Sequence, residues 1–169
     1  MRQDTLLLRL AGACALLGAL LRLNAAFPTV TIPRLSGETL YLTIDVLLML
    51  GLIGLFAGLP KFRGWLGAAG FVGAILGFAL IRTGARLPLP GDAYQTASAV
   101  LGLALAVAGA GLVPGGGVGR WVGVGWIASF VVGLAGVALH WPMGFTAASA
   151  LFCTGFALGG AGLIGGAKA

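Results

Sequence analysis

Charged side chains are scarce in this sequence of 169 residues, where Asp, Glu, Lys and Arg together make up 8%. A soluble domain carries about 25% charged residues, and a chain this poor in charge would not cover its own surface in water. Hydrophobic residues make up 59% of the sequence, so lipid is the solvent that most of the chain requires. The composition therefore excludes an ordinary water-soluble domain.

The side chains that most enzymes use are also few. His140 is the single histidine, so haem ligation by two histidines of this chain is excluded. Neither lysine lies inside an apolar run, which argues against a Schiff base within the membrane. No glycine-rich loop leads to a Lys-Ser or Lys-Thr phosphate site, and no two carboxylates face each other at helical spacing. We therefore expect a non-catalytic protein that holds no cofactor and no metal.

The basic balance does not indicate nucleic acid. Ten Lys and Arg oppose four acidic residues, but the cations stand singly at the ends of apolar runs, as membrane anchors do. No basic stripe is present for phosphates to contact. Cys14 and Cys153 each lie inside an apolar run, where a small core residue is the simplest interpretation.

Six apolar runs follow one another, and each is close to the roughly 20 residues that a helix needs to cross a bilayer. Proline and glycine separate them in short stretches that leave no room for a soluble domain. We expect an all-α integral membrane protein, a six-transmembrane-helix bundle with short loops that forms a single domain over residues 1–169. The predicted helices are about 5–23, 41–59, 65–81, 94–113, 121–139 and 145–164.

Six spans place both termini on one side of the membrane. The positive-inside rule then favours cytoplasmic termini in a cell membrane, with an inner membrane as the expected location, although the excess of cations on that side is small. The terminal side carries Arg2, Lys61, Arg63, Arg120 and Lys168, and the opposite side carries Arg22, Arg34, Arg82 and Arg86 with Glu38 and Asp92.

Polar residues gather at the face that carries the first, third and fifth loops. Asp45 lies about one turn inside the second run, where a carboxylate is costly unless it is paired or hydrated. One hypothesis is a polar vestibule for a small solute, a lipid headgroup or a proton. The alternative is an interfacial ion pair of Asp45 with Arg22 or Arg82 that fixes helix packing. The candidate site residues are Asp45, Arg22, Arg82, His140, Thr43 and Ser98.

His140 allows two interpretations. A histidine near a membrane interface can ligate the metal of a pigment or haem, or titrate near neutral pH. Because Trp141 and Pro142 follow it, a residue at a helix end in the headgroup region fits better.

Small residues recur at intervals of four in nearly every run. This spacing lets two helices pack backbone to backbone, within the bundle or against another subunit. The rows are Ala11, Ala15 and Ala19; Gly73 and Gly77; Gly102, Ala106 and Ala110; Gly125, Ser129 and Gly133; and Gly155 and Gly159.

Two segments are similar at their starts. The second run opens with Tyr-Leu-Thr-Ile-Asp over residues 41–45, and the fourth opens with Tyr-Gln-Thr-Ala-Ser over residues 94–98. The third and fifth runs are also similar at their starts, over Arg63 to Gly67 and Arg120 to Gly123. Together these similarities indicate an internal repeat in parallel orientation, of a kind that transporters often contain.

Chain length, helix count and the row of Ala11, Ala15 and Ala19 resemble the substrate-binding membrane subunits of energy-coupling-factor vitamin transporters. The resemblance implies that the row docks on another subunit. Our leading hypothesis is a non-catalytic membrane subunit that packs through small-residue faces in a larger assembly, or with itself. The alternative is a small-solute or ion transporter, or a substrate-binding membrane protein, with a polar site near Asp45, Arg82 and His140.

Overall fold

The computed structural model describes residues 2–27, 37–83 and 92–166, and nearly all of them are helical. Within these ranges, six α-helices are long and apolar enough to cross a membrane. The predicted six-helix membrane bundle is therefore confirmed, and the protein is a multi-pass membrane protein. The helices are α1 (Arg2–Ala26), α2 (Gly37–Gly58), α3 (Trp65–Thr83), α4 (Ala93–Leu112), α5 (Gly117–Ala138) and α6 (Pro142–Gly165), with the short 3₁₀ helices η1 (Pro60–Arg63) and η3 (Val113–Gly115).

The helix ends extend beyond the apolar runs for identifiable reasons. Helix α2 begins at Gly37, because the Glu38 carboxylate in its first turn interacts favourably with the helix dipole. Helix α4 is capped by Asp92, whose side chain accepts a hydrogen bond from the Gln95 N–H at 2.9 Å. Helix α6 begins at Pro142, since a proline suits the first helical position, where its missing N–H costs nothing.

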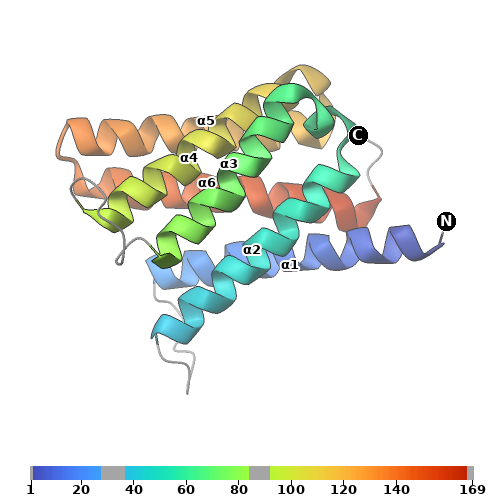
Figure 1. The fold of residues 1–169 in the computed structure, drawn as a ribbon, viewed down its shortest axis with the longest axis horizontal. Helices are drawn as coiled ribbons and strands as arrows, with labels where there is room; N and C mark the ends of the chain where they lie inside the picture. The colour runs from blue at the N-terminus through green and yellow to red at the C-terminus, as the bar shows by residue number, and fades with distance from the viewer. Residues whose placement is uncertain (1, 28–36, 84–91, 167–169) are drawn as a thin grey trace.

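The start of α1 and the end of α6 lie at the same end of the bundle (Figure 1). Helices α1, α3 and α5 end, and α2, α4 and α6 begin, at the other end, which we call the cavity end; the end where α2 and α4 end and α3 and α5 begin is the closed end. Arg34, Arg86, Lys168 and most of the proline-containing connections at 28–36 and 84–91 lie outside the described residues.

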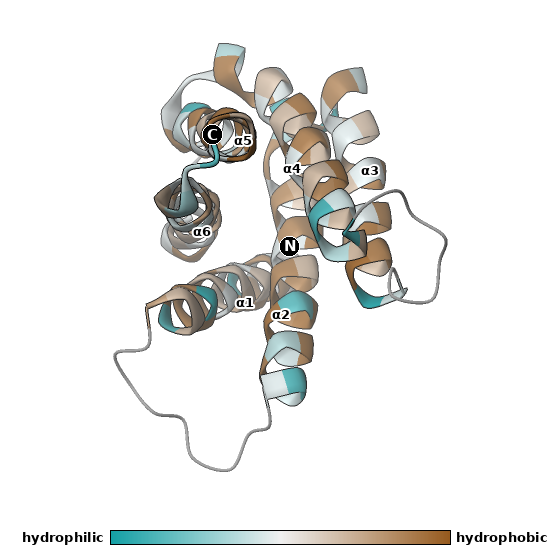
Figure 2. Cartoon of the chain, turned by 90° about the vertical axis from the view of Figure 1, so that its left-hand side faces the viewer, coloured by the Kyte–Doolittle hydropathy of each residue, from teal (hydrophilic) through white to brown (hydrophobic). Residues whose placement is uncertain are grey.

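The helices follow one another around an open ring (Figure 2). Extensive contacts join α3 to α4, α4 to α5, α5 to α6, α6 to α1 and α1 to α2, whereas α2 and α3 touch little although they are neighbours in sequence. The contact between α1 and α6 therefore joins the first and last helices of the chain, and the ring is open between α2 and α3.

The small-residue rows lie at contacts inside the bundle. Ala15 and Ala19 are fully buried, and a Cβ added at Gly51 of α2 would lie 2.6 Å from the Cβ of Ala15. A Cβ added at Gly77 would lie 2.7 Å from the Cα of Leu101. Most other positions of the rows also face helices of this chain, whereas Ala110 is exposed. The contacts are Ala11 with Gly54, Gly73 with Ala104, Gly102 with Phe130, Gly125 with Gly155, Gly133 with Ala148, Gly155 with Trp126, and Gly159 with Leu55.

Aromatic side chains fill the centre of the closed end. Phe62 of η1 lies 5.9 Å from Trp126 of α5, and Trp126 lies 5.2 Å from Phe156 of α6, centroid to centroid. All three are buried. Aromatic pairs at such distances contribute beyond their buried area, so the closed end is a packed core that joins three elements.

Candidate functional site

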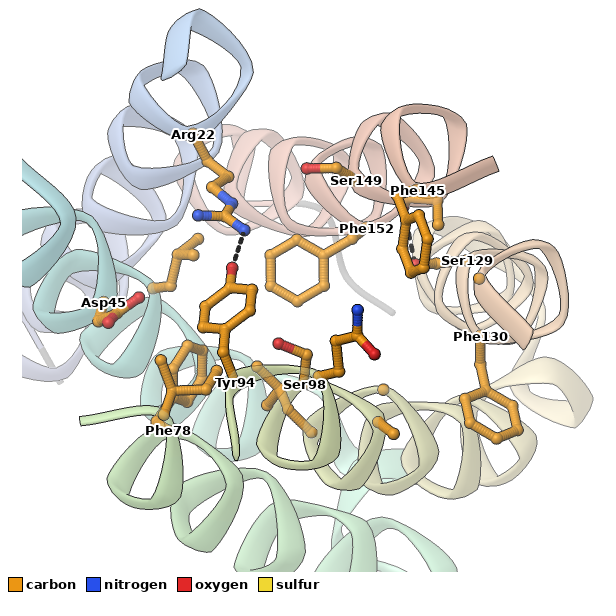
Figure 3. A pocket seen from close by; sticks show the side chains of 18 of the residues that line it. Arg22, Asp45, Phe78, Tyr94, Ser98, Ser129, Phe130, Phe145, Ser149 and Phe152 are labelled. Atoms are coloured by element: carbon orange, nitrogen blue, oxygen red, sulfur yellow. Dashed lines mark hydrogen bonds between the residues drawn. The ribbon is translucent and has the colours of Figure 1, made fainter. Parts of the chain in front are cut away.

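A cavity of about 600 Å³ opens at the cavity end and takes side chains from all six helices (Figure 3). Helix α2 presents Glu38, Tyr41, Asp45 and Leu48 to it, a spacing that keeps one helix face towards the cavity. At 1.5 Å per residue, this face runs inwards for about 15 Å. That is about half of the hydrocarbon thickness of a bilayer. We call this feature the main cavity.

Helix α6 forms a second wall with the same periodicity. Phe145, Ser149 and Phe152 line the main cavity at successive turns, and the Phe152 ring projects into its centre (Figure 3). Phe152 also packs against Phe156 with 5.0 Å between ring centroids. The inner end of the cavity therefore rests on the aromatic core of the closed end.

Asp45 and Arg82 form an ion pair across the wall between α2 and α3. The Arg82 Nε and Nη2 atoms lie 2.7 Å and 2.5 Å from Asp45 Oδ2. The side chains retain 15% exposure for Asp45 and 31% for Arg82, so the pair is partly shielded from solvent. It ties the two helices that otherwise touch little, and it neutralises both charges at the cavity wall.

Arg22 is the residue that α1 contributes to the main cavity. Its guanidinium donates a hydrogen bond to the Tyr94 hydroxyl at 2.9 Å and lies 5.5 Å from the centroid of the Tyr41 ring. A smaller cavity of about 200 Å³, the side cavity, lies near the end of α1 and shares these three residues with the main cavity. The guanidinium of Arg22 therefore contacts a neutral hydroxyl group and an aromatic ring.

Three serine hydroxyls lie on the cavity walls. Ser98 of α4 points into the main cavity (Figure 3). Ser129 of α5 donates to the carbonyl oxygen of Ala148 at 2.8 Å. The Ser149 oxygen is buried without a hydrogen bond of ordinary geometry to the described residues, and the Cys153 thiol one turn along α6 is a weak partner at best.

The structure brings four of the six predicted site residues to one cavity, namely Asp45, Arg22, Arg82 and Ser98. It also selects Arg82 over Arg22 as the ion-pair partner of Asp45. Because the pair lies in the cavity wall, the ion-pair and vestibule hypotheses describe the same place. Thr43 is exposed and donates its hydroxyl hydrogen to the Thr39 carbonyl at 2.8 Å, away from the main cavity lining.

His140 lies outside both cavities. It follows the end of α5 with a φ of 50° and is exposed, as the helix-end interpretation predicts. Histidine is among the residues that adopt this left-handed conformation more readily. In the described ranges, no three His, Cys, Asp or Glu side chains gather as a metal site. Cys14 and Cys153 are free thiols.

The aromatic lining was not predicted from the sequence as part of a site. Tyr41, Tyr94, Phe145 and Phe152 all line the main cavity, but in a sequence with so many apolar residues they do not stand out. The similarity of the second and fourth runs did carry the signal, because its two tyrosines both contact Arg22. Equivalent positions of the two segments thus meet at one side chain.

Comparison of the sequence with protein-family models, with curated proteins and with solved structures gave no match. The functional argument therefore rests on the site itself. Its walls combine aromatic surface, hydroxyl groups, the Asp45–Arg82 ion pair, the exposed Glu38 and an arginine, Arg22, that forms no ion pair among the described residues. Such a set of groups can bind and orient a molecule.

Proposed function

We propose that this chain is a small-solute-binding membrane protein whose site is the main cavity. The cavity volume carries the proposal: about 600 Å³ lies within the range of 300–1,000 Å³ that is typical of small-molecule sites. The walls match such sites in character as well, since aromatic surface predominates and a few polar groups converge. The alternative from the sequence, a transporter or substrate-binding protein, is thereby supported over a purely structural role.

We also propose that the protein acts without a chemical step, as a subunit of a larger membrane assembly. The sequence offers no phosphate-binding loop, and its short connections hold no soluble domain, so nucleotide hydrolysis, if it drives transport, would be supplied by another chain. Most positions of the small-residue rows are occupied within the bundle, so a partner would dock mainly on other surfaces. Extraction in a mild detergent should give a particle heavier than this chain, and a uniform monomer by native mass spectrometry would contradict the proposal.

The location and orientation remain part of the proposal. Cations on the terminal side favour cytoplasmic termini in an inner membrane, which would turn the cavity end outwards. An Arg120→Cys variant should then react with a membrane-impermeant thiol reagent only after the cytoplasmic face is opened. Reaction from the outside would reverse the orientation.

Filling the cavity tests solute binding. Ser98→Trp places an indole in the main cavity, whereas Leu103→Trp, on the same helix, adds the same group at a position that is 51% exposed and outside the cavity lining. Each purified protein is incubated with a small-molecule extract, washed, and denatured, and the released compounds are identified by mass spectrometry.

Wild-type protein and Leu103→Trp should release the same compounds, and Ser98→Trp should lose them, because the added ring occupies their space. Melting temperatures establish that both variants are folded. If all three folded proteins release the same compounds, or none, the main cavity is not a solute site.

A further inference from the structure

Two arginines line the main cavity in opposite electrostatic situations. Arg82 contacts the carboxylate of Asp45 through two nitrogens, so its charge is compensated. Arg22 is half-buried and donates to the neutral hydroxyl of Tyr94. A guanidinium carries five N–H donors, and no carboxylate of the described residues forms an ion pair with Arg22.

The other acidic residues of the sequence form no ion pair with Arg22 among the described residues. The connections 28–36 and 84–91 contain no Asp or Glu, and Asp4 belongs to the first turn of α1, at the other end of that helix. Glu38 lines the cavity and is exposed at the start of α2. Asp92 caps α4. The acidic groups are thus either engaged elsewhere or solvent-exposed.

Arg22 lies about one turn before the end of α1. The Asp45 carboxylate interacts with it electrostatically but is bonded to Arg82, so the desolvation of the Arg22 charge is only partly offset. A bound carboxylate or phosphate would offset that cost through paired N–H···O bonds, which suit the planar guanidinium. Arg22 borders both the main cavity and the side cavity, so its nitrogen atoms are accessible from the space where a ligand would lie.

The remaining walls suit an apolar body. Four phenylalanines line the main cavity from α3, α5 and α6, namely Phe78, Phe130, Phe145 and Phe152. Their rings offer flat apolar surface. We propose that the main cavity binds an anionic group carried on an apolar body, with the anion on Arg22 and the body among these rings. This inference rests on the proposed solute-binding function and names its ligand class.

Matched acid and amide ligands test the inference on the full chain in a neutral detergent. The probes are 1-naphthaleneacetate with 1-naphthaleneacetamide, and indole-3-acetate with indole-3-acetamide. Each pair keeps its ring system and changes only the charge. Dissociation constants come from the ligand-dependent rise in melting temperature.

The wild-type protein should bind an acid at least about tenfold more tightly than its amide, which corresponds to about 1.4 kcal/mol. Arg22→Gln should abolish this preference and leave amide binding unchanged. Arg22→Lys should retain part of the preference because it keeps the positive charge. Arg120→Gln is the matched control, because Arg120 is exposed near the start of α5 at the closed end, and it should bind like the wild type.

Equal affinity for acid and amide in the wild type, or unchanged acid affinity in folded Arg22→Gln, would overturn the anion inference and leave the cavity proposal standing. If no probe binds, the compounds lost in Ser98→Trp decide: anionic compounds support the inference, and uncharged or cationic ones overturn it. Absence of any compound that depends on the cavity rejects the proposed function itself.

An anionic lipid has the same chemistry as an organic acid, with its phosphate in place of the carboxylate. Native mass spectrometry of protein from nanodiscs of phosphatidylglycerol or phosphatidylcholine separates the two sources. Retention of phosphatidylglycerol by the wild type and its loss in Arg22→Gln, with no acid binding, would support anion recognition while overturning the small-solute proposal. Soluble acid binding without lipid retention supports both.

Discussion

The two ends of the bundle differ in how their aromatic side chains pack. At the closed end, Phe62, Trp126 and Phe156 pack with 5.2–5.9 Å between ring centroids. At the cavity end, aromatic residues of the same helices surround about 600 Å³ of unfilled volume. Phe152 belongs to both ends, since it lines the cavity and packs against Phe156. The aromatic content of the two ends is therefore similar, and the difference lies in whether the rings meet.

This contrast separates stability from binding. Removing atoms from a close-packed interior lowers the free energy of unfolding, because a cavity remains. A site that is already hollow has fewer contacts to lose and more groups free to engage a ligand. Substitutions at the closed end should therefore change the free energy of unfolding, and substitutions at the cavity end should change binding more than stability.

The largest effect is expected at the centre of the closed end. Trp126→Ala should lower the free energy of unfolding by about 3–5 kcal/mol, because it removes a buried aromatic side chain. Trp121→Ala on the same helix, where the ring is 63% exposed, should cost much less. Steric trapping in bicelles measures both. Equal losses would mean that the aromatic core does not dominate stability.

A smaller effect is expected where helices α3 and α4 approach each other. A Cβ at Gly70 would lie 2.5 Å from the Ala104 carbonyl oxygen, so Gly70→Ala should push the helices apart at a cost of about 1–3 kcal/mol. Gly119→Ala is the control, because its Cβ would meet only a Leu112 methyl group at 3.7 Å. The comparison of the two melting temperatures decides whether close approach matters, and equal shifts would argue against it.

The smallest stability effect is expected at the cavity end. Asp45→Asn removes the charge that faces Arg82, and we expect a loss of about 1–2 kcal/mol, less than for a fully buried pair because Arg82 remains about a third exposed. A double-mutant cycle with Arg82→Gln should show coupling between the two positions. Additive losses would indicate that the pair contributes nothing beyond its separate residues.

The sequence was sufficient for the helices and insufficient for the cavity. Apolar runs of about 20 residues dictate membrane helices by length and composition alone, and the structure confirms six. Asp45, Arg22 and Arg82 were predicted as neighbours because they share one membrane level, but the choice of Arg82 as partner depends on how far α2 and α3 are rotated. The hollow among Phe145, Phe152 and their neighbours depends on side-chain volumes summed over six helices, which no periodic pattern records.

The small-residue rows show the same limit. Their spacing predicted close helix contacts, and such contacts are present, as between Gly77 and Leu101. Spacing alone does not say which helix fills each row, because any small face suits any partner. In the structure, helices of the same chain fill most of these positions, and Ala110 is exposed.

The ring closure between α1 and α6 sets the order in which the bundle can be completed. Four helices are synthesised between α1 and α6, yet the two pack so closely that a Cβ added at Gly12 would lie 2.7 Å from the carbonyl oxygen of Gly160. Until α6 emerges, the seam on α1 faces lipid or a temporary neighbour, and the last helix to arrive completes the ring. Contacts so distant in sequence form late and slow assembly, so a chain released before α6 would expose the α6-facing side of α1 to quality-control proteases.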